Sequence, residues 1–405
     1  MRQLDRWNTY KLLAGYFLYE CGRAMYFVLV TWFLYQWTED AIYTGLFVSF
    51  GFIPGIFSNL IFGVLVDRHN RKWLANISGS VSVIILCLLF LSFVFSWFSP
   101  WWVILTHMLL QTCGSLFRPS LQALVAEVFK EEELPNIFSL SGSATISGSL
   151  AGAALGGLLS TFVTMPLSLA VVILFYCSAL TAVVFLQYSP VRRLSKKHTS
   201  FITEIGEGFS FLNANRMMYG LLVTLMLGQL TFHTTLGFLS VYTSEYLQRS
   251  AIIYGALDIT FSIGGIAAGL LGAWWWKRME NHIAVYSLAA VAAGLLFVGI
   301  TKSITAAFLG ILLIGLGTSF VRALLQSVQQ MATPKELHGR MASLRMLCNQ
   351  TSVVITGPVF GVIAKNYGAG SVFLFLLIPV LLGLIWSIFQ ARHPQFIKIT
   401  SHKSA

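Results

Sequence analysis

The sequence predicts an all-α polytopic membrane protein, with twelve transmembrane helices in two six-helix bundles related by pseudo-symmetry. Composition is the first reason, because 56% of the 405 residues are hydrophobic, only 10% are charged, and the mean hydropathy is +0.76. A water-soluble core of this size does not need so much apolar sequence, so lipid is the expected solvent. The other two reasons are a series of twelve apolar segments and a weak internal repeat.

Each apolar segment is long enough for a helix that crosses the bilayer, which takes about 20 residues. In chain order the predicted spans are residues 11–37, 41–66, 74–97, 101–127, 137–161, 166–188, 217–245, 251–274, 282–301, 305–329, 341–365 and 370–391. The first contains Glu20 and Arg23 and no small-residue cleavage pattern follows it, so we expect a retained helix rather than a signal peptide.

Basic residues predict the orientation, because Lys and Arg are enriched in cytoplasmic segments. With the N-terminus inside, only Arg249, Lys302 and Lys365 of the 26 basic residues fall outside, four lie within spans, and nineteen are cytoplasmic. We therefore expect a bacterial inner (plasma) membrane protein with both termini in the cytoplasm. The same short basic loops explain the net charge of +11, so no nucleic-acid partner is expected.

Two halves of similar design are predicted on either side of a charged segment. The expected parts are an N-terminal bundle at residues 1–188, a central cytoplasmic loop at 189–216 and a C-terminal bundle with a short tail at 217–405. Arg118 and Gln122 have counterparts in Arg322 and Gln326, 204 residues later. Repeats of this kind are common in secondary transporters, whose substrate site lies between the repeats.

The loop after the second span carries a motif of glycine, an aspartate–arginine pair and two further basic residues. Its members are Gly63, Asp67, Arg68, Arg71 and Lys72. A loop that only obeyed the positive-inside rule would not need the glycine or the aspartate. The motif resembles the loop signature of the major facilitator superfamily. That resemblance implies the major facilitator fold and transport by alternating access between inward- and outward-open states.

The fourth span and its exit, from Pro119 through Glu127 to Pro135, are similar to the branch of that superfamily that holds macrolide-efflux and enterobactin-export proteins. In this branch an acidic residue at the position of Glu127 joins Asp67 and Arg71 in a conformational latch. The fifth span has glycines at 148, 152 and 156, resembling the antiporter signature of exporting members. Close helix packing explains these glycines equally well.

Six charged residues lie deep within predicted spans, where a charge is costly and indicates a function. Four are arginines and two are carboxylates: Arg23, Arg118, Arg322, Arg345, Glu20 and Asp258. Glu20 and Arg23 are three residues apart and could neutralise each other. Arg118 could extend to the interface, and Asp258 is a candidate partner for Arg322 or Arg345. The excess of arginine favours an anionic or zwitterionic substrate.

Polar residues repeat at helical spacing on several spans and predict the lining of a cavity. The candidate substrate contacts are Arg118, Arg322, Gln111, Gln122, Gln326, His107, Gln229, Arg345 and Asn349. His107 and His233 have a competing explanation, because such residues often hydrogen-bond a neighbouring helix. Arg345 has the weakest case, because its span usually lies outside the inner ring of this fold.

Energy for transport is expected from an ion gradient, because the chain has no GxxxxGK phosphate-binding loop. Protons are the expected coupling ion, with Glu20 beside Arg23 as the leading carrier, Asp258 as the second and His233 as a third. No enzymatic activity, cofactor or metal is expected, and the five cysteines show no metal-ligand spacing.

The predicted function is proton-coupled export of an anionic or zwitterionic metabolite such as a siderophore, by a protein that acts as a monomer. Three alternatives share the same polar faces. They are a siderophore importer, a multidrug efflux pump of the macrolide type, and a lysophospholipid flippase.

Overall fold

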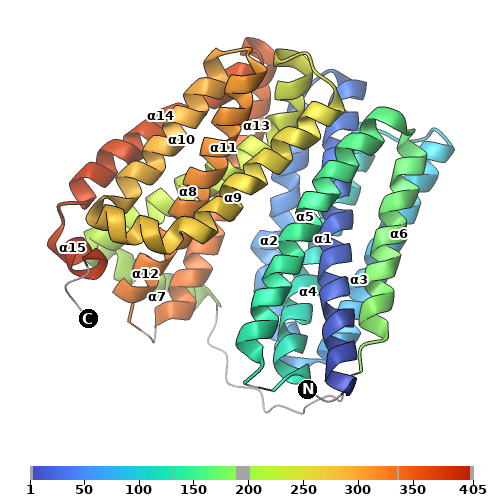
Figure 1. Ribbon diagram of the computed structural model, residues 1–405, viewed down its shortest axis with the longest axis horizontal. Coiled ribbons are helices and arrows are strands. Elements are labelled where there is room, and N and C mark those ends of the chain that lie inside the picture. Colours follow the sequence, from blue (N-terminus) through green and yellow to red (C-terminus); the bar gives the residue numbers. More distant parts are fainter. Residues whose placement is uncertain (1–2, 131, 188–200, 335–336, 402–405) are drawn as a thin grey trace. The chain divides into compact units, whose positions relative to one another are not determined.

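A computed structural model describes residues 3–130, 132–187, 201–334 and 337–401 of the chain, and every regular element in these ranges is a helix (Figure 1). The predicted all-α class is therefore confirmed. Among the described residues, nine helical segments are long and apolar enough to cross a membrane, and Ala41–Phe57 is a shorter apolar helix. The total of twelve crossings stays a prediction.

Every predicted span coincides with a helix or with a helix interrupted by a π-helical turn. In the first half these are α1 (Gln3–Thr38), α2 (Ala41–Arg68), α3 (Arg71–Val94), α4 (Pro100–Val128), α5 (Leu134–Phe162) and α6 (Met165–Val184). In the second half they are α8 (Arg216–Val241) with η1 (Tyr242–Tyr246), α9 (Ala251–Met279), α10 (Ile283–Ile300), α11 (Ile304–Phe320) with η3 (Val321–Leu325) and α12 (Gln326–Ala332), α13 (His338–Tyr367) and α14 (Ala369–Gln390).

Three further helical elements were not expected from the sequence. They are α7 (Phe201–Ala214), the 3-10 turn η2 (Glu280–His282) and α15 (Pro394–Thr400). Helix α7 lies inside the segment predicted as the central loop. The apolar pattern of these pieces is too short to cross a bilayer.

The chain divides into two compact units. Unit 1 comprises residues 1–39, 49–197 and 250–256, and unit 2 comprises 40–48, 198–249 and 257–405. Each unit thus includes a short piece of a helix whose remainder belongs to the other unit. In unit 1, Tyr254 at the start of α9 hydrogen-bonds Thr31 of α1 at 2.7 Å. In unit 2, Lys365 of α13 pairs with Asp40, just before α2, at 2.6 Å.

Helix α1 forms the centre of unit 1, where it packs against α5 and α6, while α3 packs against α4 and α6. Small residues make the α1–α5 contact close. A Cβ atom at Gly156 would lie 2.9 Å from Cβ of Val28 and 3.1 Å from the carbonyl oxygen of Met25. In unit 2, α10 packs against α11 and α14, and α8 packs against α13 and α14.

Candidate functional site

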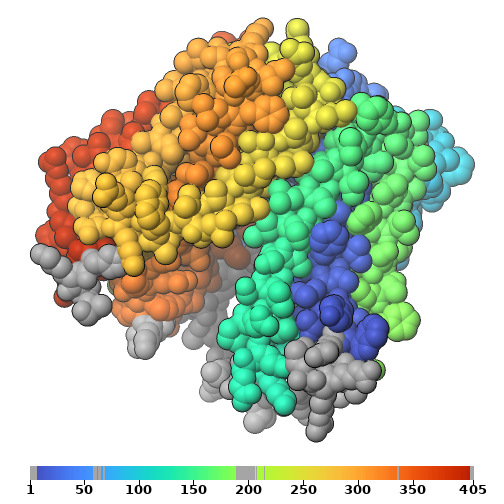
Figure 2. Space-filling view, viewed as in Figure 1, coloured from blue at the N-terminus to red at the C-terminus, as the bar shows by residue number. Residues whose placement is uncertain are grey.

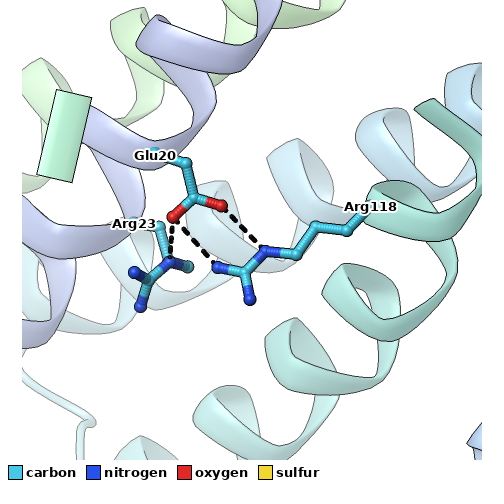
Figure 3. A network of polar contacts seen from close by, with 3 residues as sticks. All are labelled: Glu20, Arg23 and Arg118. Atoms are coloured by element: carbon cyan, nitrogen blue, oxygen red, sulfur yellow. Dashed lines mark hydrogen bonds and ion pairs between the residues drawn. The ribbon is translucent and has the colours of Figure 1, made fainter. Parts of the chain in front are cut away.

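The buried carboxylate of Glu20 holds two arginines in unit 1 (Figure 3). Arg23, on the same face of α1, donates from Nε to Oε2 of Glu20 at 2.7 Å. Arg118, on α4, approaches both carboxylate oxygens, with Nε 2.8 Å from Oε1 and Nη2 3.0 Å from Oε2. A bidentate pair of this kind fixes orientation as well as charge. The single negative charge of Glu20 is therefore shared by two positive charges, which leaves a net charge of +1 in this group.

An aromatic wall supports this network. Tyr19 stacks on Phe117 with ring centroids 4.4 Å apart, and the guanidinium of Arg118 lies 5.8 Å from the Tyr19 ring. Gly114 leaves room for this tyrosine, because a Cβ atom there would lie 2.8 Å from its hydroxyl oxygen. The Glu20 side chain is 6% exposed, whereas that of Arg118 is 48% exposed. The arginine can therefore meet a ligand that the carboxylate cannot reach.

The sequence anticipated the Glu20–Arg23 pair but not the partner of Arg118. Sequence spacing reveals neighbours within one helix, while this contact joins residues 98 positions apart. Arg118 extends towards α1 rather than towards the end of its own helix. Its role as a substrate contact stays a prediction.

The remaining candidates on α4 differ in burial. His107 is 4% exposed and stacks on Tyr26 with ring centroids 5.9 Å apart. It also lies against Gly51 of α2, where a Cβ atom would be 2.5 Å from Nε2 of the histidine. This close packing supports the helix-contact explanation for His107. Gln111 is partly exposed and Gln122 is exposed, as a cavity lining requires.

Arg322 lies within the π-helical turn η3 of unit 2, between α11 and α12. Its guanidinium sits 4.3 Å from the centroid of the Phe232 ring on α8. Turns of this kind are rare and occur frequently at functional sites, because they re-aim side chains relative to an α-helix. The regular 100° spacing assumed from sequence therefore does not hold through this segment, and Gln326 begins the next helix.

Arg345 donates from Nη1 to Oε1 of Gln329 at 2.6 Å. The amide nitrogen of Gln329 and the amide oxygen of Asn349 are both buried, and neither has a hydrogen-bond partner among the described residues. Buried amides without partners are costly, so this polar cluster has unused hydrogen-bonding capacity. Within the same described ranges, neither Arg322 nor Arg345 forms an ion pair.

Two candidate residues on α8, Gln229 and His233, contact each other. Gln229 Nε2 lies 2.5 Å from Nε2 of His233, and the histidine ring meets Phe232 edge-on. Asp258 is partly buried on α9 in unit 2. Phe232, which touches both Arg322 and His233, was not singled out from the sequence, because one aromatic residue among 32 phenylalanines carries no signal.

A further ion pair in unit 1 connects the start of α3 with the end of α4. Arg71 Nη1 lies 2.6 Å from Oε1 of Glu127, with the two side chains 9% and 4% exposed. Arg71 also donates to the carbonyl oxygens of Ala123 at 3.3 Å and Val66 at 3.5 Å. The structure thus brings together these two members of the predicted latch. Gly63, Asp67 and Arg68 lie within α2, but the surroundings of these three residues are outside the described part of the structure.

Glu127→Gln is expected to lower the free energy of unfolding by about 2 kcal/mol, because the amide keeps a hydrogen bond to Arg71 but loses the charge. Thermal unfolding of the detergent-solubilised protein measures the effect. The matched control is Glu132→Gln, because this glutamate is exposed and close in sequence. Equal midpoints for the two variants would contradict a stabilising role of the pair.

Among the described residues, no group of three or more His, Cys, Asp or Glu could hold a metal ion. What the helices do provide is guanidinium groups next to aromatic rings and amides. Such groups recognise carboxylates and phosphates.

Known proteins with similar sequences are membrane transporters. The chain is 20% identical to an uncharacterized MFS-type transporter, YvqJ of Bacillus subtilis, over 87% of this chain and 84% of that protein. It is 24% identical to a multi-drug resistance efflux pump PmrA homologue of Lactococcus lactis over 87% of this chain and 85% of that protein. It is 22% identical to macrolide efflux protein A of Streptococcus pyogenes over 67% of this chain and 69% of that protein.

Solved structures show the same fold. The nucleoside transporter NupG superposes with a TM-score of 0.76 at 16% identity, over 95% of this chain and 99% of that one. An inward-facing, unoccupied bacterial homologue of the human lysosomal transporter Spinster superposes with a TM-score of 0.75 at 13% identity, over the full length of both. The family model described as Major Facilitator Superfamily matches residues 12–352 and 231–403. The chain therefore belongs to the major facilitator superfamily, the family that its loop motifs predicted.

Proposed function

We propose that this transporter exports an anionic or zwitterionic organic metabolite and that protons drive the export. One observation carries the proposal: Glu20 is shared by two arginines, and Arg322 and Arg345 have no ion-pair partner among the described residues. A site for lipophilic cations would have the opposite charge balance. The proposed arrangement has twelve crossings, with both termini in the cytoplasm and the monomer as the working unit.

Competition for Arg118 provides a route for coupling. A substrate carboxylate that binds this exposed guanidinium replaces Glu20, which then keeps only Arg23 as its partner. A buried carboxylate that loses one of two cationic partners favours its protonated form more than before. Proton binding at Glu20 and substrate binding at Arg118 would therefore be energetically linked rather than independent. Asp258 and His233 remain secondary candidates for the same role.

The arginines of unit 2 suit the acidic groups of such a substrate. Arg322 rests one face on Phe232 and keeps its in-plane donors for a carboxylate. Near Arg345, the amides of Gln329 and Asn349 offer one further donor and one further acceptor. A siderophore that bears carboxylate or catecholate groups would match both features. The direction, export, is supported by the names of two relatives, which are efflux proteins.

Arg322→Gln is expected to weaken binding of an anionic substrate by about tenfold, the effect of losing one charge-assisted hydrogen bond. Arg322→Lys keeps the charge but not the planar fork, so an intermediate loss is expected. A binding screen of ferric and iron-free chelators identifies the ligand, and isothermal titration then compares the variants.

The control for this series is Arg249→Gln, because Arg249 is exposed in the loop between η1 and α9. Transport in proteoliposomes with an imposed pH gradient completes the test. Accumulation of an organic acid in a deletion strain supports export, whereas impaired uptake favours import. Equal affinity of wild type and Arg322→Gln for every acid bound would contradict the proposed role of Arg322.

Multidrug efflux is the second candidate, because the relatives from Lactococcus lactis and Streptococcus pyogenes are named as multidrug and macrolide efflux proteins. Expression in a drug-sensitive host separates the two functions. Raised resistance to lipophilic cations and macrolides, without transport of organic acids, would replace the first proposal.

A further inference from the structure

A cluster of exposed cations lies at one end of unit 2, and none of its members belongs to the candidate site described above. It combines Lys277 and Arg278, at the end of α9, with Arg392 and Lys398, next to and within α15. None of the four forms an ion pair with any described residue. The nearby Glu280 is the one acidic residue between positions 277 and 282.

Specific contacts hold the two parts of this cluster together. Asn281, in η2, donates from its side-chain amide to the carbonyl oxygen of Ala391 at 2.9 Å. Helix α15 packs against η2 and α12, with Phe396 fully buried and Thr400 1% exposed. Neither docking contact uses a cation, so all four charges remain available to a ligand. We call this surface the α9–α15 patch (Figure 1).

Along one face of α9 the exposed side chains are first apolar, then aromatic and then basic, in the order of the acyl region, the interface and the headgroups of a membrane. Leu270 is 81% exposed, Trp274 is 55% exposed, and Arg278 is exposed, each four residues after the last. Residues at this spacing share a helix face, and eight residues of helix rise about 12 Å. Tryptophan is enriched at the level of lipid headgroups. In Figure 2 the gold spheres, which include this end of α9, lie on the surface in this view.

We propose that the α9–α15 patch binds the headgroup of an anionic phospholipid. Arg278, Arg392 and Lys398 would contact the phosphate, Trp274 would lie at the level of the glycerol, and Leu270 would contact an acyl chain. The positive-inside rule alone explains cations at the end of one helix. It does not explain why a separate short helix is docked beside that end, with one further cation within it and another just before it. Basic clusters next to membrane helices attract anionic lipid, and each charge adds to the attraction.

The test compares lipid retention by native mass spectrometry of the full chain, after incubation with phosphatidylglycerol or with phosphatidylcholine. Wild type is expected to retain phosphatidylglycerol in preference to phosphatidylcholine. The triple variant R278Q/R392Q/K398Q is expected to bind it about tenfold more weakly or worse, since three charges are lost. The control triple K130Q/R249Q/K302Q has the same net charge and also changes exposed residues, and it is expected to behave as wild type.

A second variant tests the site without changing its charge. Asn281→Ala releases the Ala391 carbonyl and should loosen the docking of α15, so weaker retention is expected although every cation remains. Equal losses in both triple variants would mean that net charge alone attracts lipid, and the proposal would be wrong. Binding of soluble glycerol phosphate as tight as that of the lipid would also contradict it, because the α9 stripe would then contribute nothing.

Discussion

Glu20→Gln is expected to abolish proton-driven transport and to lower the free energy of unfolding by about 3 kcal/mol. The substitution removes the one carboxylate shared by Arg23 and Arg118, and it leaves two guanidinium groups to repel each other. Removing one partner of a buried ion pair costs about 3–5 kcal/mol. The lower end applies here, because the Arg118 side chain is 48% exposed and water solvates part of its charge. Proteoliposome transport measures the loss of proton-driven transport, and thermal unfolding measures the loss of stability.

Two transport assays separate a coupling role of Glu20 from a purely structural one. Substrate exchange at equal pH on both sides needs binding and alternating access but no net proton movement. If Glu20 carries the proton, Glu20→Gln should retain part of this exchange and lose transport driven by a pH gradient. Glu20→Asp keeps the charge and should recover part of the gradient-driven transport. Glu132→Gln, at an exposed position, controls for general loss of acidic residues.

Full gradient-driven transport by Glu20→Gln would remove Glu20 from the coupling mechanism. Asp258 and His233 would then become the first residues to test. If Glu20→Gln lowered substrate exchange and gradient-driven transport in equal proportion, and also lowered the unfolding midpoint, Glu20 would have a structural role alone.

Hydropathy located the helices of this protein well, because a helix in lipid must be apolar over its whole length. The predicted second and fourth spans differ from α2 and α4 by no more than two residues at either end. Short elements escaped this criterion. Helix α15 has a single buried aromatic residue, Phe396, and its existence depends on docking against η2 and α12.

The spacing of residues in the sequence could not predict which helices contact one another. Periodicity shows that Arg118 shares a face with Gln111 and Gln122, but it does not show which helix that face meets. The same limit hid the pairing of Arg345 with Gln329. Arg71 and Glu127 were grouped only because the loop resembles a known family signature. Their ion pair supports that grouping, whereas the side chain of Asp67 lies outside the described part of the structure.

The glycines of α5 illustrate a motif with two explanations, and the structure favours packing. A Cβ atom at Gly152 would overlap the backbone carbonyl of Cys21 on α1 and lie 3.0 Å from Cβ of Ala24. At Gly148 a Cβ atom would meet the backbone of Phe17, one turn earlier on the same helix. Such small residues let two membrane helices approach until their backbones touch.

Gly152→Ala is therefore expected to lower the free energy of unfolding by about 3 kcal/mol, because α1 and α5 must move apart to admit one methyl group. In an open helix position the same change stabilises by about 0.5–1 kcal/mol, since alanine has the higher helix propensity. Thermal unfolding in detergent measures the effect. Gly142→Ala is the matched control on α5, because a Cβ atom there would have no neighbour within 4 Å.

The two alanine variants should thus shift the unfolding midpoint in opposite directions, although both make the same chemical change in one helix. A Gly152→Ala protein as stable as Gly142→Ala would show that α1 and α5 do not depend on close approach. If that stable protein also transported substrate without using the proton gradient, the glycine would have a role in coupling rather than in packing. A large loss of stability, with coupling retained in the protein that remains folded, would assign the motif to packing.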